Sequence, residues 1–480
     1  MYRFCQMKKY NFKTKPFDHQ RKALDLSWSK KNYAYFMEMG TGKTKVAIDN
    51  IGILKLQNEL DIVIIAAPKS VYINWETEIE THLSDQVPYK IFAWQRDKKP
   101  IDDAILDGKL GIYLINIEAL SHKSGVKFVK ELLLRYRNSM FIIDESTTIK
   151  NQGAMRTKSV LKIAPQSKYR RILTGSPVTK SPLDLYTQCG FLSPELLGFS
   201  SYYSFRARYA VMDQIRVGND RYIFAPKYYT NLDELEAKLA EFSYRVRKDD
   251  CLQLPKKNRY IRTVDLTAEQ QKTYDELKQR ALAIIEDDQI SFNNKLTELL
   301  RLHQVTCGFV KGDSGVVREF KKCPKTEELM NIIDETDSKI IIWANYVYNI
   351  KNIMNKLEAK YGKGSTVAIF GEVSREDRQA AVKSFQEDPN CRFFVGNPTT
   401  GGFGLTLTAA SYVVYFSNTF NLEVRQQSED RAHRIGQKSD VTYIDLLAQK
   451  TVDHYILRTL QSKIKLSAKT LGEDVRAFLC

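Results

Sequence analysis

Two groups of short apolar segments, separated by a long charged stretch, constrain the fold of this 480-residue chain more than any other feature. Continuous apolar runs of this kind are typical of parallel strands that helices cover on both faces. Each run ends in a polar or glycine-bearing loop, and longer helical patterns lie between the runs. The sequence therefore predicts an α/β fold with two parallel sheets. The expected strands lie at Ile62–Ala67, Ile112–Ile115, Met140–Ile143, Arg171–Thr174, Lys339–Trp343, Thr366–Phe370, Arg392–Val395 and Tyr412–Phe416.

The same pattern predicts two domains, because a chain of this length exceeds the size of one hydrophobic core. The charged stretch between the two groups runs from about residue 190 to 335, and we predict that it is mostly helical. We expect an N-terminal domain at residues 1–255, with a helical extension from about 190. The C-terminal domain is expected at residues 256–480, preceded by a helical segment that ends near 335. Loops at the strand ends of two such sheets would place a ligand cleft between them.

A glycine-rich loop follows the apolar stretch Tyr33–Phe36 and precedes a helical pattern. This order of strand, glycine loop and helix is what a phosphate-binding loop requires. Gly40 and Gly42 let backbone N–H groups surround phosphate oxygens, and the helix N-terminus favours negative charge. We expect Lys43 to reach the β- and γ-phosphates and the Thr44 hydroxyl to hold Mg²⁺. The alternative is a glycine turn that only happens to precede Lys-Thr.

A second apolar strand ends in two acids, Asp144 and Glu145, about 100 residues after the glycine loop. Asp144 is placed to hold the Mg²⁺ shell, and Glu145 to orient or deprotonate the attacking water. An acidic pair that merely opens a loop is common, but a strand-borne pair at this distance from Gly-Lys-Thr is much rarer by chance. Together the two segments predict hydrolysis of ATP or GTP.

Seven strings along the chain are similar to the helicase motifs of one family. In motif order from I, Ia and II to VI they are Met37–Thr44, Ala67–Trp75, Asp144–Asn151, Leu173–Pro177, Lys339–Tyr346, Thr399–Ala410 and Gln427–Gln437. The last is the most specific. The chain thus resembles the Swi/Snf-class translocases of superfamily two over residues 16–465, as a minimal member that suits a virus or a bacterium. The resemblance implies two RecA-like parallel-sheet lobes with helical insertions between them.

The resemblance also implies ATP and Mg²⁺ as cofactors. Gln20 would contact adenine and favour ATP over GTP, although an ordinary role at a helix start is the alternative. Arg431 and Arg434 would be arginine fingers that reach the γ-phosphate across the cleft, and their spacing of three predicts one shared helix face. Planar guanidinium suits phosphate oxygens. The residues assigned to the nucleotide are Gln20, Gly40, Thr41, Gly42, Lys43, Thr44, Gly404 and Gln427.

Duplex DNA is the expected track, because this family usually follows duplexes without separating the strands. The 73 Lys and Arg residues outnumber the 57 Asp and Glu residues, which suits a polyanionic partner. Repeated closing of the cleft on ATP and reopening after hydrolysis would move a monomer along the track. Contacts are expected to phosphates, not to bases, with a plain loop role as the alternative for each residue. The candidates are Lys69, Ser70, Asn116, Lys150, Asn151, Asn345, Thr400, Gly401 and Gly402.

The sequence also limits where the protein works. No apolar run approaches the roughly 20 residues that span a bilayer, and the first residues lack the apolar stretch of a secretory signal. We therefore expect no membrane contact and a cytoplasmic location, in a bacterium or a virus-infected cell. Seven irregularly spaced cysteines argue against both a disulfide framework and a structural zinc site.

The chain departs from the family pattern at several positions, of which Ser146 and Thr147, in place of Ala-His, bear most on mechanism. They call into question the usual coupling between motifs II and III. The other departures are Met37, Thr399, Thr400 and Ser417. Two other functions stay open: an RNA helicase, whose motif II would usually be Asp-Glu-Ala-Asp, and a protein remodeller that uses DNA only as footing. Intact Lys43, Glu145 and Arg434 argue against a non-hydrolysing scaffold.

Overall fold

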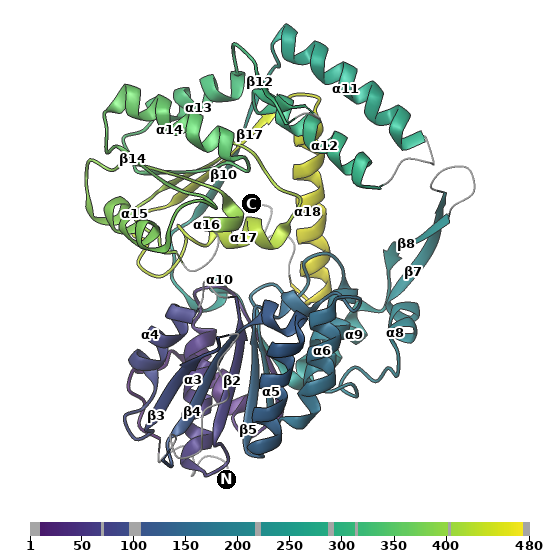
Figure 1. Ribbon diagram of the computed structural model, residues 1–480, viewed down its shortest axis with the longest axis vertical. Coiled ribbons are helices and arrows are strands. Elements are labelled where there is room, and N and C mark those ends of the chain that lie inside the picture. Colours follow the sequence, from purple (N-terminus) through teal and green to yellow (C-terminus); the bar gives the residue numbers. More distant parts are fainter. Residues whose placement is uncertain are drawn as a thin grey trace. The chain divides into compact units, whose positions relative to one another are not determined.

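The computed structural model describes residues 10–68, 72–95, 107–216, 222–286, 292–312, 315–401 and 405–473. The chain forms two compact units (Figure 1). The first unit contains Met1–Ala210, Tyr229–Gln253 and Leu466–Glu473, and the second contains Val211–Tyr228, Leu254–Lys465 and Asp474–Cys480. Each unit is built around its own parallel sheet.

The first unit has a seven-stranded sheet in the order β3-β4-β2-β5-β6-β1-β9, with every neighbouring pair parallel. Its strands are β1 (Asn32–Met37), β2 (Ile62–Ala67), β3 (Tyr89–Ala93), β4 (Leu110–Asn116), β5 (Ser139–Asp144), β6 (Tyr169–Leu173) and β9 (Ser243–Val246). Its helices are α2 (Asp18–Ser27), α3 (Lys43–Leu56), α4 (Tyr72–His82), α5 (Lys123–Arg135), α6 (Met155–Ile163), α7 (Leu185–Leu192), α8 (Tyr202–Tyr209), α9 (Leu232–Phe242) and α10 (Lys248–Cys251). Short 3₁₀ helices are η3 (Ile117–Ser121), η4 (Ser146–Ile149), η5 (Ala164–Gln166) and η6 (Pro182–Asp184).

Helices cover both faces of this sheet. On one face, α2, α3 and α4 contribute Leu24, Ile48 and Trp75 to a core that includes Val63 of β2. On the other face, aromatic contacts join the sheet to α5 and α7, with Tyr113 against Phe128 and Phe141 against Phe191. Because both faces are buried, β2 is apolar at every position and β5 is apolar from Met140 to Ile143, and this explains why the sequence revealed these strands.

The second unit has a six-stranded parallel sheet in the order β10-β17-β16-β13-β15-β14. Its strands are β10 (Lys257–Val264), β13 (Ile340–Trp343), β14 (Thr366–Ile369), β15 (Phe393–Gly396), β16 (Tyr412–Tyr415) and β17 (Val441–Ala448). Its helices are α11 (Ala268–Glu286), α12 (Phe292–Thr306), α13 (Pro324–Asp334), α14 (Val347–Tyr361), α15 (Arg375–Glu387), α16 (Pro398–Gly401) and α17 (Leu422–Glu429). A last helix, α18 (Val452–Thr470), begins in this unit. Two separate cores again lie on the two sheet faces.

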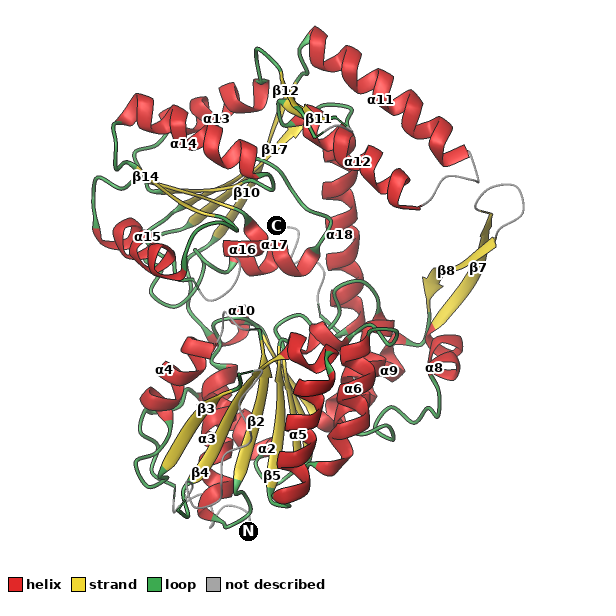
Figure 2. Ribbon diagram, viewed as in Figure 1, coloured by secondary structure: helices red, strands yellow, loops and turns green. Residues whose placement is uncertain are grey.

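The predicted fold class, two parallel α/β sheets with helical insertions, is confirmed (Figure 2). The prediction that residues 190 to 335 are mostly helical is wrong, because strands β9 and β10 lie there together with two antiparallel pairs. These pairs are β7 (Ala210–Arg216) with β8 (Tyr222–Tyr229), and β11 (Phe309–Lys311) with β12 (Val317–Glu319). Edge strands β9 and β10 each have one neighbour and keep polar side chains, so no apolar run marks them in the sequence. No helix of the described segments is long and apolar enough to cross a membrane.

A buried polar cluster joins α12, α13 and α18 in the second unit. The Asp453 carboxylate pairs with Lys325 Nζ (2.6 Å) and accepts a hydrogen bond from Thr306 Oγ1 (3.0 Å). His303 lies beside this pair and its Nδ1 is 2.9 Å from the Tyr346 hydroxyl. Burial lowers the pKa of His303 to about 4; the Asp453 carboxylate opposes this shift, and the Lys325 ammonium adds to it. His303 is therefore neutral in the folded chain.

This neutral histidine predicts a loss of stability in acid. Between pH 6.5 and 4 the unfolded chain binds a proton at His303 that the folded chain does not, so stability falls as the pH falls through that window. At about 1.4 kcal/mol per unit, we expect His303 to remove about 2 kcal/mol from the free energy of unfolding between pH 7 and pH 5. Urea unfolding of wild type and His303→Gln at the two pH values measures this difference. The exposed His122→Gln serves as control, and an equal pH dependence in all three proteins would contradict the prediction.

Candidate functional site

The glycine loop of the first unit connects β1 to α3 and has the backbone of a phosphate-binding loop. Gly40 and Gly42 adopt φ angles of 82° and 85°, a region that side chains disfavour. Gly42 is the N-cap of α3, and Lys43 is its first residue. The first N–H groups of any helix have no acceptor within the helix, so they point at whatever lies beyond its end. This is where the sequence placed the phosphates of a nucleotide.

Two side chains of the preceding helix hold this loop. Gln20 Nε2 donates to the Thr41 carbonyl (3.1 Å), and His19 Nε2 lies 2.8 Å from the same oxygen. Gln20 Oε1 also accepts a hydrogen bond from Phe17 N (3.0 Å), and its side chain is buried. Gln20 therefore lies at the loop, where it fixes the backbone of Thr41. Its predicted contact with adenine stays a prediction.

The loop predicts a sharp effect for one substitution. A Cβ atom added at Gly42 would clash with Gln20 Nε2. The residue would also have to keep a φ of +85°, which is unfavourable for any side chain. We expect Gly42→Ala to weaken nucleotide binding by about tenfold to a hundredfold, the equivalent of roughly 1.4 to 2.7 kcal/mol. Titration with a fluorescent ATP analogue measures this affinity. Gly190→Ala is the matched control because its nearest neighbour would be 3.7 Å away; equal affinities for the two variants would contradict the prediction.

Asp144 and Glu145 follow β5 at the carboxyl edge of the same sheet. Trp75 Nε1 donates to Asp144 Oδ2 (2.9 Å), and Glu145 N donates to Asp144 Oδ1 (3.0 Å). Burial raises the pKa of the Asp144 carboxyl, and the Lys43 ammonium partly opposes that shift. The sheet thus brings Lys43 of the glycine loop within electrostatic reach of Asp144. A nearby cation stabilises the charged form of a buried carboxylate, and a divalent metal such as Mg²⁺ would do so here.

The Asp-Glu pair is connected to motif III through a residue that the sequence did not indicate. Ser146 Oγ donates to Gln188 Oε1 (2.7 Å), and Gln188 Nε2 donates to the Pro177 carbonyl (2.8 Å). Gln188 is fully buried on α7. Ser146 therefore makes a connection between motifs II and III even though the usual Ala-His is absent. The role of Gln188 follows only from its contacts in the folded structure, because the residue lies outside every sequence motif.

Arg245, on edge strand β9, is another residue that the sequence did not indicate. Its side chain contacts both the glycine loop and the motif III loop. Its NH1 donates to the carbonyls of Phe36 (3.2 Å) and Gly175 (2.9 Å), and its NH2 pairs with Glu38 (3.3 Å). Gly175 in turn packs so closely on the loop that a Cβ there would be 3.1 Å from the Met39 nitrogen. Motif III and the glycine loop are therefore in direct contact.

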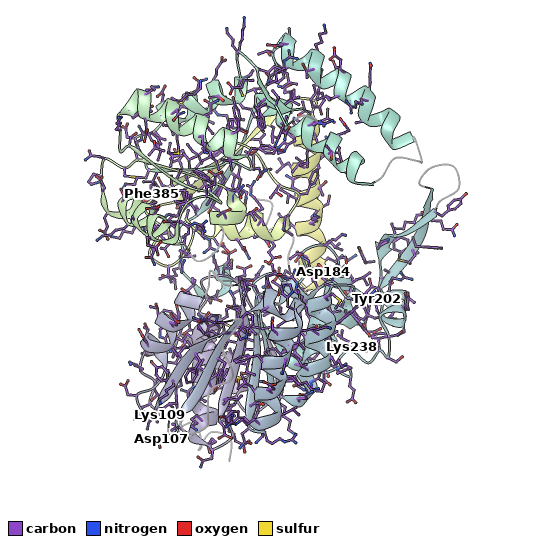
Figure 3. The ribbon with its side chains drawn as sticks, in the orientation of Figure 1. Asp107, Lys109, Asp184, Tyr202, Lys238 and Phe385 are labelled. Carbon is purple, nitrogen blue, oxygen red and sulfur yellow. The ribbon has the colours of Figure 1, made fainter. Side chains whose placement is uncertain are left out.

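Three of the predicted nucleic-acid contacts lie in described loops of the first unit. Asn116 caps η3 by accepting from Glu118 N (3.2 Å), and Asn151 Oδ1 accepts from Gly153 N. Lys150 Nζ donates to Thr179 Oγ1 (2.6 Å). Asp184, labelled in Figure 3, fixes that part of the loop because its Oδ2 accepts from backbone N–H groups at Thr179, Lys180 and Ser181. Lys69 and Ser70 lie outside the described residues.

The second unit carries the other predicted contacts. Asn345 follows β13; its Nδ2 donates to the Asn418 carbonyl (2.7 Å) and its own carbonyl accepts from Asn397 Nδ2 (2.8 Å). Thr400 N donates to Asn397 Oδ1 (3.3 Å), and Gly401 ends the short helix α16. Asn397 thus brings Asn345 and Thr400 together at one edge of the sheet. Gly402 and Gly404 lie outside the described residues.

Arg431 and Arg434 follow α17, and the prediction that they share a helix face is wrong. The helix ends at Glu429, and tight turns follow, with Arg431 N bonded to Ser428 O and Ala432 N to Glu429 O. Both guanidinium groups nonetheless meet at one point, because each donates to the Leu405 carbonyl (3.2 and 3.3 Å). Arg431 Nε also donates to the carbonyl of the buried Gln427 (3.0 Å).

The helix α17 is anchored by a buried ionic cluster that the sequence did not indicate. Arg425 stacks on the Tyr415 ring at 3.5 Å and pairs with both Glu429 and Asp445. Arg259 of β10 forms a second, two-pronged pair with Glu429 (2.7 and 2.8 Å). Although burial opposes it, these two arginines hold the pKa of Glu429 well below its usual range.

Comparison with known families agrees with these motifs. Residues 19–308 match the SNF2-related domain, and residues 324–436 match the helicase conserved C-terminal domain. The chain is 28% identical over 446 residues to an uncharacterized ATP-dependent helicase of Mycoplasma pneumoniae, covering 92% of this chain and 40% of that protein. A SWI/SNF-related regulator of chromatin from Caenorhabditis elegans is 28% identical over 91% of this chain and 59% of its own length.

Two further likenesses come from a human protein and an archaeal structure. The human DNA annealing helicase and endonuclease ZRANB3 is 28% identical, over 91% of this chain and 38% of its own. The SWI2/SNF2 ATPase core of Sulfolobus solfataricus in complex with dsDNA is 26% identical, with a TM-score of 0.45, 95% of this chain covered and 93% of that one. The chain therefore spans about two fifths to three fifths of the length of these three relatives.

Proposed function

The chain belongs to the SNF2-related family, and from that premise we propose that it is an ATP-dependent motor that moves along duplex DNA. Its action would remodel DNA structures or DNA–protein complexes. The observation that carries this proposal is the assembly of the glycine loop, Lys43 and Asp144 at one edge of the first sheet. Relatives named as ATP-dependent helicases and as a DNA annealing helicase support the same class of activity.

The residues present fit ATP and Mg²⁺. The N–H groups at the start of α3 and the Lys43 ammonium would hold the phosphates. Thr44 and Asp144 would hold the metal, which neutralises charge on the transferred phosphoryl group when it is bound. Glu145, buried at the end of β5, would accept the proton of the attacking water. Arg431 and Arg434 would serve as arginine fingers.

The DNA track is proposed on the polar groups that follow the strands. Asn116, Lys150 and Asn151 in the first unit, and Asn345 and Thr400 in the second, are amides, hydroxyls and an ammonium on fixed loops. Such groups bind phosphate oxygens without reading the bases. A motor that must move over any sequence needs contacts of this kind.

Steady-state ATP hydrolysis tests the proposal, measured with no nucleic acid, duplex DNA, single-stranded DNA or RNA. We expect strong stimulation by duplex DNA that Lys43→Ala and Arg434→Ala each abolish. Lys363→Gln, an exposed lysine in a turn of the second unit, is the control and should behave as wild type. Stimulation by RNA alone would favour an RNA helicase. Hydrolysis indifferent to every polynucleotide would refute the DNA motor.

A further inference from the structure

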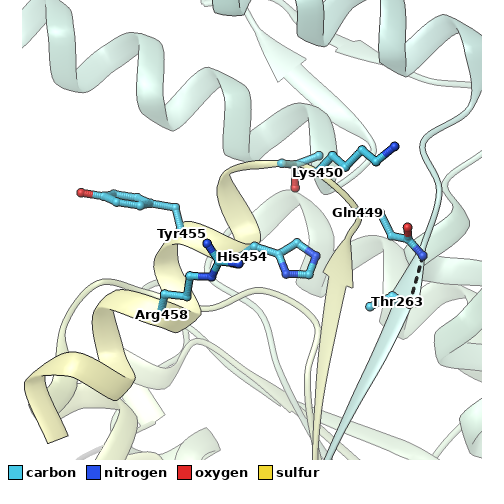
Figure 4. A pocket seen from close by; sticks show the side chains of 7 residues that line it. Thr263, Gln449, Lys450, His454, Tyr455 and Arg458 are labelled. Carbon is cyan, nitrogen blue, oxygen red and sulfur yellow. Dashed lines mark hydrogen bonds between the residues drawn. The ribbon is translucent and has the colours of Figure 1, made fainter. Parts of the chain in front are cut away.

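An open pocket of about 450 Å³ lies on the second unit, apart from all of the predicted contacts (Figure 4). Its walls come from the end of β10, the turn after β17 and the first turns of α18. The residues that line it are Thr263, Gln449, Lys450, Thr451, His454, Tyr455 and Arg458. Gln449 Nε2 donates to Thr263 Oγ1 (3.3 Å), so a hydrogen bond joins the two strand ends at the base of the pocket.

The residues that line the pocket include two cations and no acid. Asp453, in the first turn of α18, is buried and pairs with Lys325 (2.6 Å) while accepting from Ala448 N (2.9 Å). Lys450 and Arg458 are exposed, and neither charged group has an acceptor within the described ranges. Figure 4 shows Arg458 and His454 projecting from successive turns of α18, with Lys450 on the turn that precedes it. The site thus presents two positive charges, an imidazole and the hydroxyl group of Thr263, because the Thr451 hydroxyl is buried and donates to the Ala448 carbonyl.

The backbone at Lys450 adopts an unusual conformation. Lys450 has φ of 56°, the left-handed region where glycine or asparagine is the least strained residue. A lysine at this position places a long cationic side chain at the mouth of the pocket at a cost in backbone energy. The strain alone assigns no function, but it allows a substitution that removes the charge without harming the fold.

The pocket lies at the same sheet edge as the predicted DNA contacts of its unit. All strands of this sheet are parallel, so the carboxyl ends of β10 and β17 share one edge with those of β13 and β15. Asn345 and Thr400 follow β13 and β15. Because neighbouring strands are about 4.8 Å apart, β17 and β13 are separated by about 10 Å. This span is shorter than one turn of a duplex, about 34 Å.

We propose that this pocket binds the phosphodiester backbone of nucleic acid and extends the DNA track along the edge of the second sheet. Lys450 and Arg458 would each neutralise one phosphate. The exposed Thr263 hydroxyl, which accepts from Gln449 and keeps its own hydrogen, and His454 would donate hydrogen bonds. A sequence-independent contact of this kind suits a motor, and the inference rests on the proposed function. An acidic protein segment could also be drawn to these charges, but the shared edge with Asn345 and Thr400 favours nucleic acid.

The test compares two double variants of the full chain. Lys450→Asn with Arg458→Gln removes the pocket charges, and asparagine suits the left-handed backbone. Lys356→Gln with Lys363→Gln removes two exposed cations of the same unit outside the pocket, so the net charge matches. Fluorescence anisotropy with a 30-base-pair duplex (an arbitrary probe length, about three turns) gives Kd at several salt concentrations. We expect the pocket variant to lose affinity about tenfold and its salt dependence to fall by about two counterions.

Two readouts keep the result decisive. The thermal unfolding midpoint of the pocket variant should not fall below that of the control, so weaker binding reports lost contacts, not lost folding. Lysine acetylation followed by mass spectrometry should show Lys450 protected by the duplex and Lys363 unprotected. If wild type binds no nucleic acid, the proposed function fails. If wild type binds but the pocket variant matches the control, only this inference is overturned, and binding of an acidic polypeptide then becomes the next question.

Discussion

Replacing Glu145 with glutamine is expected to slow DNA-stimulated ATP hydrolysis by about 10²- to 10⁴-fold while leaving ATP binding intact. Glu145 is buried at the end of β5 and has a left-handed φ of 52°, which turns the chain sharply just after Asp144. Glutamine has nearly the same size and preserves this turn, but its amide cannot accept a proton from the attacking water. The substitution therefore separates proton removal from nucleotide binding.

The measurement pairs turnover with affinity. Turnover is followed at saturating duplex DNA, and affinity is measured with a fluorescent ATP analogue. Glu241→Gln, an exposed carboxylate of the same unit, is the control and should hydrolyse ATP like wild type. Lys43→Ala should differ from Glu145→Gln, because the loss of a phosphate contact weakens binding as well as turnover. Turnover of Glu145→Gln within threefold of wild type would mean that another group accepts the proton.

The parts of this protein that could be predicted are those in which local sequence decides local structure. Strand β2 and the middle of β5 are buried on both faces and are unbroken apolar runs, and the glycine loop needs residues that tolerate positive φ. Gly40, Gly42 and the presence of a helix after the loop therefore followed from the sequence, as did the Asp-Glu pair at the end of β5.

The missed features depend on partners far away in the chain. Strand β10 contains charged, polar and apolar residues in no regular alternation, and it is a strand because β17 pairs with all eight of its positions. Asp445 is a charged residue within β17, and its burial is explained by partners outside the strand, Arg425 and Asn418. Arg431 and Arg434 leave the helical path because the chain turns after Glu429, whose carboxylate is held by Arg259. The partners in each of these contacts lie at no fixed separation in the sequence, so no sequence motif predicts them.

The fully buried Arg171 of β6 is a further feature with no sequence signal, and removing it should cost the first unit stability. Its guanidinium donates to the carbonyls of Ser27 (3.2 Å), Lys30 (2.8 Å) and Lys31 (2.9 Å). Two further bonds reach the Arg170 carbonyl (2.9 Å) and Asn50 Oδ1 on α3 (3.0 Å). The last carbonyl groups of a helix have no N–H donor within the helix. The end of α2, at Ser27, is buried. Arg171 supplies the missing donors.

We expect Arg171→Met to lower the free energy of unfolding by about 3 to 5 kcal/mol, because the buried Ser27 carbonyl, the buried Asn50 side chain and the part-buried carbonyls of Lys30 and Lys31 would lose their donor together. Arg170→Met, on the neighbouring position with one side-chain bond to Asn32 (2.9 Å), should cost less than about 1 kcal/mol. Urea unfolding followed by circular dichroism compares the two, and costs within 1 kcal/mol of each other would contradict the assignment. Because α2 carries Gln20 and β1 leads into the glycine loop, the folded fraction of Arg171→Met should also bind ATP more weakly. A variant that lost stability but kept full ATP affinity would show that Arg171 supports the sheet without positioning the nucleotide loop.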